Sequence, residues 1–340
     1  MGTPAIEGIT VRAVEARRRI VLPEVRDPRV LEAAREITDR EYARVTLLGS
    51  RQVLEAAGAE QGLRLDGMEL IDPADDPRRH HYARQLAEAR RKQGMTVGQA
   101  EELLQNPVYY GGQLVADGRV DGMVAGSICS TADTIRAALW SVGTAAGCRT
   151  ISGCSIMQTM VHEVGVGGAL IFADTGVVPE PTAEQLADIA IQAGEACRTF
   201  LEVEPRVAMI SFSTKGSAYS PAVELVIDAT RRARSMRPDM MIDGEFQVDA
   251  ALIPEVATRK AGSSVVAGRA NVLVFPSLSV GNVAYKLVER LGQARALGPL
   301  LLGLNKPVND LSRGCSVEDI VLLTAVTAVQ GAHLREVRRP

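Results

Sequence analysis

The chain has 340 residues, of which 46% are hydrophobic and only 4% are aromatic. This is enough for two α/β domains with cores of Ala, Val, Leu and Ile. The 38 basic and 41 acidic residues leave a net charge of −3, which provides no general basic surface for a nucleic acid, so an anionic substrate has to be held by individual arginines.

Cysteine usage and hydropathy bear on the cellular location. The five cysteines are widely spaced and form no C-x-x-C pair, so neither a disulfide framework nor a thiolate metal site is indicated. No apolar run reaches the roughly 18 residues that a membrane span requires. The first ten residues also lack a basic-then-apolar signal pattern. We therefore expect a cytoplasmic protein without a membrane partner.

Strand and helix patterns alternate in the first part of the chain. Short apolar runs predict strands at residues 18–24, 45–49 and 68–71, and amphipathic stretches predict helices at 29–37 and 51–57. This alternation predicts a parallel sheet built by right-handed crossovers.

Two segments follow that carry charge or hydroxyl groups on helical patterns. Residues 78–94 hold five arginines and one lysine, a run typical of a solvated helix face. Ser130 and Asp133 then form an S-x-x-D pattern ahead of a predicted helix at 134–142. The free amides of that helix end could hold phosphate near Arg136. Simple capping, with Arg136 in solvent, explains the same residues, and both interpretations stay open.

The second half continues with predicted strands at 169–173 and 207–212 and predicted helices at 182–201 and 221–234. The loop at 213–218 offers a lysine, a glycine and three hydroxyls ahead of a helix. Such a loop could cradle an anion, although it lacks the spacing of a P-loop.

Three acidic residues, Asp243, Glu245 and Asp249, could face one side of a predicted strand and hold a hard cation. Solvated carboxylates or partners for nearby basic residues would account for them without a metal. The four histidines have no ligand spacing either, and we predict no metal site.

The C-terminal part contains the densest group of candidate residues. A predicted strand at 271–275 is followed by a helix at 282–291, whose Arg290 lies where basic residues commonly compensate the helix dipole. An apolar run at 300–304 and a helical pattern at 320–329 then flank residues 305–319. This pattern predicts a crossing from a buried strand to a helix, where open α/β sheets bind ligands.

The crossing carries a hydroxyl, a permanent cation and a carboxylate, at Ser312, Arg313 and Asp319. These groups suit the handling of a phosphorylated acyl group. Ser316 and Asp319 also form an S-x-x-D capping box, so a purely structural role for the carboxylate stays open.

The sequence Pro-Val-Asn-Asp-Leu-Ser-Arg-Gly-Cys at 307–315, followed by Asp319, resembles the C-terminal signature of the phosphate acetyltransferase (phosphotransacetylase) family. Similar family segments are found at 122–136, at Ser-Thr-Lys-Gly-Ser (213–217) and at Val-Gly-Asn-Val-Ala-Tyr-Lys (280–286). The resemblance covers about residues 18–330. It is loosest at 147–168, which leaves the acyl chain length open.

The resemblance implies an architecture and a reaction. The expected fold has two α/β domains with mostly parallel sheets, similar to the isocitrate/isopropylmalate dehydrogenase-like fold, with the active-site cleft between them. The domains would comprise residues 1–146 plus 302–340, and residues 147–301. The implied enzyme is a homodimer that reversibly transfers acetyl between acetyl phosphate and coenzyme A through a ternary complex. It needs no cofactor beyond coenzyme A as a substrate.

The resemblance also implies residue roles. Asp319 would take the proton of the coenzyme A thiol, Ser312 would donate to the oxyanion and Arg313 would bind the phosphate. An ordinary aspartate is a weaker base than a thiolate by about 4.6 pKa units, so this role requires the substrate to exclude water from the carboxylate. Substrate-binding roles are implied for Arg90, with Arg91 as a competing assignment, and for Ser130, Thr131, Arg136, Ser213, Thr214, Lys215 and Arg290.

Three other functions remain. The first is the same chemistry on a longer acyl group, in a phosphate butyryltransferase. The second is a metal-dependent hydroxyacid dehydrogenase that would use Asp243 to Asp249. The third is a noncatalytic sensor that binds an acyl ligand without turnover.

Overall fold

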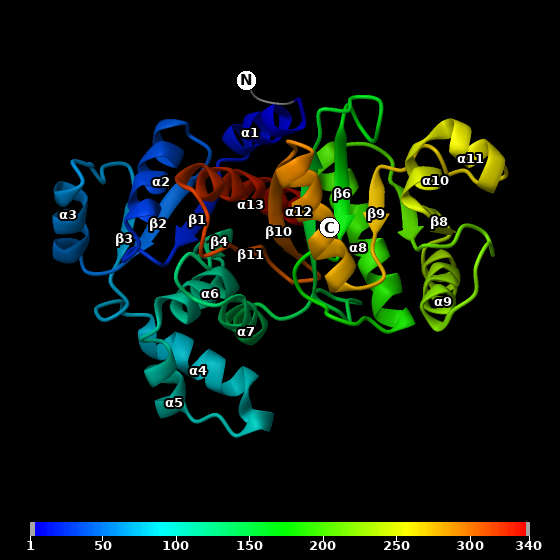
Figure 1. Ribbon diagram of the computed structural model, residues 1–340. Helices are drawn as coiled ribbons and strands as arrows, with labels where there is room; N and C mark the ends of the chain where they lie inside the picture. The colour runs from blue at the N-terminus through cyan, green and yellow to red at the C-terminus, as the bar shows by residue number, and fades with distance from the viewer. Residues whose placement is uncertain (1–3, 338–340) are drawn as a thin grey trace. The chain divides into compact units, whose positions relative to one another are not determined.

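The computed structural model describes residues 4–337, which form two compact units (Figure 1). Residues Glu7–Ala146 and the segment that begins at Leu304 form one unit, which we call the signature unit because it carries the 307–315 motif. Residues Gly147–Gly303 form the other, which we call the middle unit, and residues 4–6 are assigned to it.

The signature unit is built on a five-stranded parallel sheet in the order β11-β4-β1-β2-β3. The parallel arrangement that the alternating pattern predicted is therefore confirmed. The strands are β1 (Arg19–Leu22), β2 (Arg44–Leu48), β3 (Glu69–Ile71), β4 (Gly122–Ala125) and β11 (Val308–Asp310).

Helices cover both faces of this sheet. Gly122 faces Thr327 of one helix, and the next residue, Met123, faces Gly111 of another, so α13 and α6 lie on opposite faces. The helices of the unit are α1 (Pro4–Ala16), α2 (Pro28–Asp39), α3 (Arg51–Glu60), α4 (Arg79–Ala89), the 3₁₀ turn η1 (Arg91–Gln93), α5 (Val97–Leu103), α6 (Pro107–Asp117), α7 (Thr131–Ser141) and α13 (Val317–Val337).

Helix α13 corrects one expectation from the sequence. Within the described residues, Val317–Leu334 is long and apolar enough to cross a membrane by length and composition, although no such run was expected. However, 61% of this segment is buried inside the structure. Ile320, Val321 and Val326 are fully buried, and α13 packs on α2, β1 and β4. It is therefore a core helix.

The middle unit has a six-stranded mixed sheet in the order β10-β5-β6-β9-β7-β8. Strand β5 runs antiparallel to both of its neighbours, and the remaining pairs are parallel. The strands are β5 (Ser152–Gln158), β6 (Ala169–Ala173), β7 (Arg206–Ile210), β8 (Met241–Phe246), β9 (Val272–Val274) and β10 (Arg295–Leu302). The helices are α8 (Ala183–Leu201), α9 (Pro221–Met236), α10 (Val248–Leu252), α11 (Pro254–Ala261) and α12 (Leu278–Leu291).

The predicted strand at 300–304 does not lead into the signature as expected. It is the end of β10, an edge strand of the middle sheet that pairs antiparallel with β5. The strand that precedes the signature loop is β11, which lies inside the motif and has a polar sequence. Asn309 of β11 is buried, and its amide is satisfied there because it donates to Thr327 Oγ1 of α13, at 2.9 Å. Hydrogen bonds to the core helix thus replace the apolar pattern that the prediction relied on.

Candidate active site

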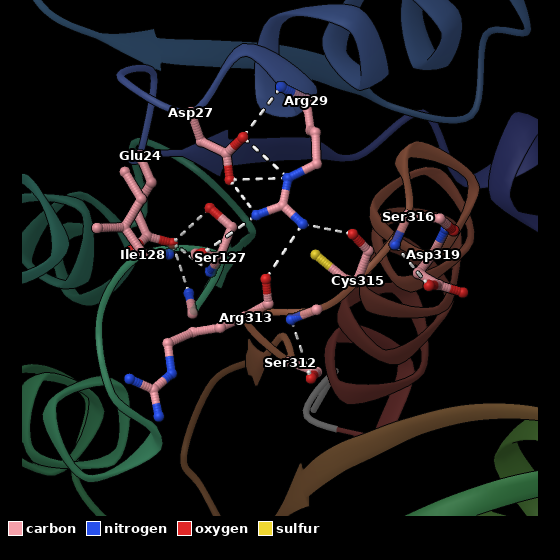
Figure 2. Close-up of polar contacts among 12 residues, drawn as sticks. Glu24, Asp27, Arg29, Ser127, Ile128, Ser312, Arg313, Cys315, Ser316 and Asp319 are labelled. Atoms are coloured by element: carbon pink, nitrogen blue, oxygen red, sulfur yellow. Dashed lines mark hydrogen bonds and ion pairs between the residues drawn. The ribbon is translucent and has the colours of Figure 1, made fainter.

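The signature loop joins β11 to α13 at the carboxyl edge of the signature sheet. Asp310 is the last residue of β11 and pairs with Ala125, the last residue of β4. The segments that follow β1, β4 and β11 therefore meet at one edge (Figure 2). In parallel α/β sheets, this edge is the usual place for a ligand.

Arg29 fixes the signature loop from helix α2. Its Nη1 donates to the carbonyls of Arg313, at 3.1 Å, and Cys315, at 2.5 Å. Its Nε and Nη2 bind the carboxylate of Asp27, the N-cap of α2, with a closest distance of 2.6 Å. Burial acts to raise the pKa of Asp27, but hydrogen bonds from Arg29 and Ser127 outweigh it, and the net effect lowers this pKa. Arg29 therefore holds the backbone of the signature loop, a role that the sequence did not predict.

Glu24 holds the neighbouring loop between β4 and α7. Its buried carboxylate accepts hydrogen bonds from the backbone N–H groups of residues 126–129, at 2.6 to 3.1 Å, and from Ser127 Oγ, at 3.2 Å. Consecutive N–H groups of this kind form a site suited to an anion. Here the anion is supplied by the protein itself. Sequence reasoning missed Glu24 as well, because its partners lie 102 to 105 residues further along the chain.

The structure brings Ser312, Arg313 and Asp319 onto one exposed segment, but their side chains do not touch one another. Ser312 Oγ accepts from the N–H of Gly314, at 3.3 Å. The Arg313 guanidinium forms no hydrogen bond or ion pair with any residue that the structure describes. Figure 2 shows it leaving the loop on the side away from Asp319.

Asp319 takes part in the predicted capping box. Its Oδ2 accepts from the N–H of Ser316, at 2.8 Å, and Ser316 Oγ accepts from the N–H of Asp319, at 3.2 Å. The carboxylate is exposed, and its Oδ1 has no partner among the side chains and backbone groups that the structure describes. Capping therefore orients the carboxylate and leaves one oxygen available.

Helix α7 begins at Thr131, three residues earlier than predicted, because Ser130 is its N-cap. Ser130 Oγ accepts from the N–H of Asp133, at 3.2 Å, and Asp133 pairs with Arg136, at 2.7 Å. Both features match the capping interpretation. Arg136 nevertheless remains exposed on the first turns of the helix.

Thr131 connects α7 to the signature strand. Its Oγ1 donates to Oδ2 of Asp310, at 2.6 Å, while Asp310 Oδ1 is buried without a partner among the described residues. Burial raises the pKa of Asp310 to about 6, although the hydroxyls of Thr131 and Thr134 act in the opposite direction. The hydrogen bond between Thr131 and Asp310 connects the start of α7 to the residue that precedes the signature loop.

Arg90 and Arg91 have different surroundings. Arg90 is half-buried, and its guanidinium lies 4.7 Å from the ring centroid of Trp140 on α7. Stacking of this kind fixes the position of a cation without neutralising it. Arg91 has a side chain that is 77% exposed and pairs with Glu88 at 3.8 Å. Of the two, Arg90 is the arginine with a fixed position.

The other candidate residues lie in the middle unit. Ser213 Oγ and the N–H of Gly216 both donate to Glu245, at 2.8 Å. Lys215 pairs with Asp243 at 2.7 Å, and the hydroxyl of Thr214 accepts from the N–H of Gln247. The donors of the 213–217 loop thus bind internal carboxylates.

Arg290 stands apart from this loop, at the end of α12. Its side chain is 81% exposed and pairs with Glu289 at 3.3 Å. That placement is the one expected of a residue that compensates the helix dipole.

The three acids considered for a cation have separate partners. Asp243 binds Lys215 and Ser264, Glu245 binds the 213–217 loop, and Asp249 pairs with Lys260 at 2.9 Å. Within the described part of the chain, no three His, Cys, Asp or Glu side chains form a group that could hold a metal ion.

The family comparison shows the class of the protein, which is an acyltransferase with two α/β units. The family model described as phosphate acetyl/butaryl transferase matches residues 5–328, and the chain belongs to this family. The membership predicted from the 307–315 motif is thus confirmed.

Similar curated proteins support this placement. The phosphate acetyltransferase of Thermoanaerobacterium thermosaccharolyticum is 46% identical over 325 residues, which cover 96% of this chain and 98% of the relative. That of Clostridium acetobutylicum is 44% identical over 325 residues, with the same coverage of 96% and 98%.

Solved structures agree. A phosphotransacetylase from Streptococcus pyogenes has a TM-score of 0.91 at 39% identity and covers 98% of this chain and 100% of its own. A 4-hydroxythreonine-4-phosphate dehydrogenase from Klebsiella pneumoniae has a TM-score of 0.53 at 13% identity and covers 93% of this chain and 99% of its own, which shows a shared fold alone. The predicted fold class is confirmed.

Proposed function

We propose that the chain is a phosphate acetyltransferase, which reversibly converts acetyl phosphate and coenzyme A into acetyl coenzyme A and phosphate through a ternary complex. The observation that carries this proposal is the exposed signature loop at the carboxyl edge of a parallel sheet, where the Arg313 guanidinium has no partner among the described residues. The names of relatives at 46% and 44% identity support it.

The proposed chemistry begins with the thiol of coenzyme A. The free Oδ1 of Asp319 takes the thiol proton, and the sulfur attacks the carbonyl carbon of acetyl phosphate. Ser312 donates to the oxyanion, a role worth roughly 3 to 4 kcal/mol. The bond between the carbonyl carbon and the phosphate oxygen then breaks. Arg313 binds the leaving phosphate through its planar set of donors.

The remaining candidates hold anionic parts of the substrates. Arg90 is supported by its fixed position on Trp140. A substrate-binding role for Arg136 is supported by its exposure near the start of α7. Hydrogen bonds from Thr131 and to Ser130 fix the first turn of this helix. Further candidates for contact with coenzyme A, from the middle unit, are Ser213, Thr214, Lys215 and Arg290.

Thioester formation from acetyl phosphate and coenzyme A, followed by ultraviolet absorbance, tests the proposal. Butyryl phosphate is the matched comparison, because the family description covers both acyl groups. We expect acetyl phosphate to react faster. Preference for butyryl phosphate would assign the enzyme to the longer acyl group, and binding without any thioester would contradict catalysis.

We further propose a cytoplasmic homodimer whose two domains correspond to the two compact units. These proposals follow from the family resemblance and from the division of the chain into the signature and middle units. Sedimentation equilibrium should give about twice the chain mass of 36.3 kDa, and a single-chain mass would contradict the dimer.

A further inference from the structure

Asp310 is a buried carboxylate to which the chemistry described above gives no role. It is the last residue of β11, and only 2% of its surface is exposed. Its Oδ2 accepts the hydroxyl of Thr131 at 2.6 Å, but its buried Oδ1 has no hydrogen-bond partner among the described residues. An ionised oxygen buried in this way lowers the stability of the folded chain. Stability therefore does not explain why a carboxylate stands here.

The loop between β4 and α7 lies directly against this oxygen. Gly126 has a φ of +109°, and a Cβ on it would overlap Asp310 Oδ1 and lie 2.7 Å from the backbone N of Leu311. Only glycine fits there. The loop nevertheless gives Asp310 no donor, because the N–H groups of residues 126–129 donate to Glu24, at 2.6 to 3.1 Å (Figure 2).

The groups that surround Asp310 include no cation that acts on its pKa. Burial and the carboxylate of Glu24, after β1, raise this pKa, whereas the hydroxyls of Thr131 and Thr134, on α7, lower it. Cys129, whose Sγ lies 3.1 Å from Thr134 Oγ1, has a pKa raised to about 12 and is neutral. Since the pKa of Asp310 is about 6, the carboxylate is ionised at neutral pH and protonated in mild acid. At neutral pH its bond from Thr131 is charge-assisted.

This hydrogen bond joins two segments that carry proposed substrate-binding groups. Thr131 is the first residue of α7, and Arg136 lies exposed on the second turn of that helix. Asp310 itself comes directly before the segment that carries Ser312 and Arg313. One carboxylate therefore connects the start of α7 to the signature loop.

We propose that Asp310 is a positioning residue for the transfer of the acetyl group. Through Thr131, its carboxylate holds the first turn of α7 in place relative to Ser312 and Arg313. Protonation removes the charge from this hydrogen bond and weakens it by about half. The two segments are then held less firmly, and the groups that bind acetyl phosphate lose their alignment. The inference rests on the proposed acetyltransferase function.

The kinetics of Asp310→Asn at several pH values test this inference. At pH 7.5, kcat/KM for acetyl phosphate should fall about tenfold or more, because the charge-assisted hydrogen bond is lost. At pH 5 the wild type is itself protonated at this position, so the ratio of the wild-type to the variant value should fall toward one. The ratio cancels the titration of the substrates, which both proteins share. A ratio that does not change with pH would overturn the inference.

Thermal or denaturant unfolding separates positioning from a structural role. Because the ionised carboxylate is costly to bury, the stability of Asp310→Asn relative to the wild type should rise with pH, while its relative kcat/KM falls. Stability and activity that fall together would indicate a structural role and overturn the inference. Asp188→Asn is the matched control, since Asp188 is a buried carboxylate of the middle unit that accepts the Thr150 hydroxyl at 3.3 Å. Its kinetic ratio should not depend on pH.

Thr131→Val tests whether Asp310 acts through this hydroxyl. Once Thr131→Val is in place, Asp310→Asn should cause little further loss of kcat/KM, because the hydrogen bond is already absent. An equal loss with and without Thr131→Val would overturn the inference. A wild type that forms no thioester would contradict the proposed function, and the inference with it. Wild-type turnover with equal losses in the two backgrounds would contradict the positioning role alone.

Discussion

At the scale of single residues, the proposed function gives one carboxylate, that of Asp319, two roles. One oxygen of Asp319 accepts the N–H of Ser316 and completes the cap of α13, while the other has no partner among the described residues. Capping and proton transfer are therefore compatible, and substitutions can separate them. The capping box alone does not reveal this, because the same spacing fits a purely structural role.

Asp319→Asn keeps an oxygen that can accept the Ser316 N–H but removes the base. We expect turnover to fall by orders of magnitude while thermal stability changes little. Ser316→Ala is the counterpart: it removes a cap worth about 1 kcal/mol and leaves the base in place. Arg313→Gln should also reduce turnover by orders of magnitude. Near-wild-type rates in Asp319→Asn or in Arg313→Gln would refute the corresponding role.

Asp310 gives a prediction about pH. Burial raises its folded-state pKa from 3.8 to about 6, so the folded protein holds this proton more tightly than the unfolded chain. Wild-type stability should therefore fall as pH rises from about 4 to about 6, by up to about 3 kcal/mol from this group.

Asp310→Asn has no such group, so its stability relative to the wild type should rise across the same range and level off above it. Denaturant unfolding at pH 4, 5, 6 and 7 measures this difference. A difference that does not depend on pH would contradict the raised pKa.

At the scale of helices and strands, the sequence predicts the features that depend on residues close together in the chain. These features are the alternation of strands and helices and the caps at Ser130 and Ser316. Strand β11 was not, because a three-residue strand of Val, Asn and Asp has no apolar pattern and depends on hydrogen bonds to α13.

Glu24 and Arg29 were missed for a related reason. Their key partners lie 102 to 105 and 284 to 286 positions away in the chain, so no local spacing marks them. The motif identified the family and the signature loop. The residues that hold this loop in place became visible only in the folded chain.

Glu24→Gln tests how the loop between β4 and α7 is held. The amide NH₂ of glutamine cannot accept hydrogen bonds, so part of the group of N–H donors would be buried without an acceptor. We expect a loss of about 1 to 3 kcal/mol in stability. Faster amide hydrogen exchange at residues 126–129 should accompany it. Glu41→Gln is an exposed control, and wild-type exchange rates in Glu24→Gln would show that Glu24 does not hold the loop.

At the scale of the whole molecule, the proposed function requires individual arginines to hold the anionic substrates. The net charge of −3 leaves no general attraction for anions. Among the described residues, the Arg313 guanidinium has no hydrogen-bond or ion-pair partner, and the Arg90 guanidinium stacks on Trp140. Affinity should therefore depend on a few residues, each with a large effect.

The chain should also work without a metal ion. Asp243, Glu245 and Asp249 each bind separate partners, so they are not arranged as a ligand set for a cation. We expect EDTA to leave the rate of thioester formation unchanged. We also expect no change in nicotinamide absorbance, with or without magnesium. If EDTA abolished the rate and magnesium restored it, the prediction would be wrong and these acids would become candidate metal ligands.

Buried carboxylates that occupy backbone N–H groups recur in both units. Glu24 fills the loop before α7, Glu245 binds the 213–217 loop, and Asp174 accepts from the N–H groups of Gly153, Gly176, Val177 and Val178. These backbone N–H groups are therefore already occupied, so under the proposed function phosphate has to be held by side chains such as Arg313.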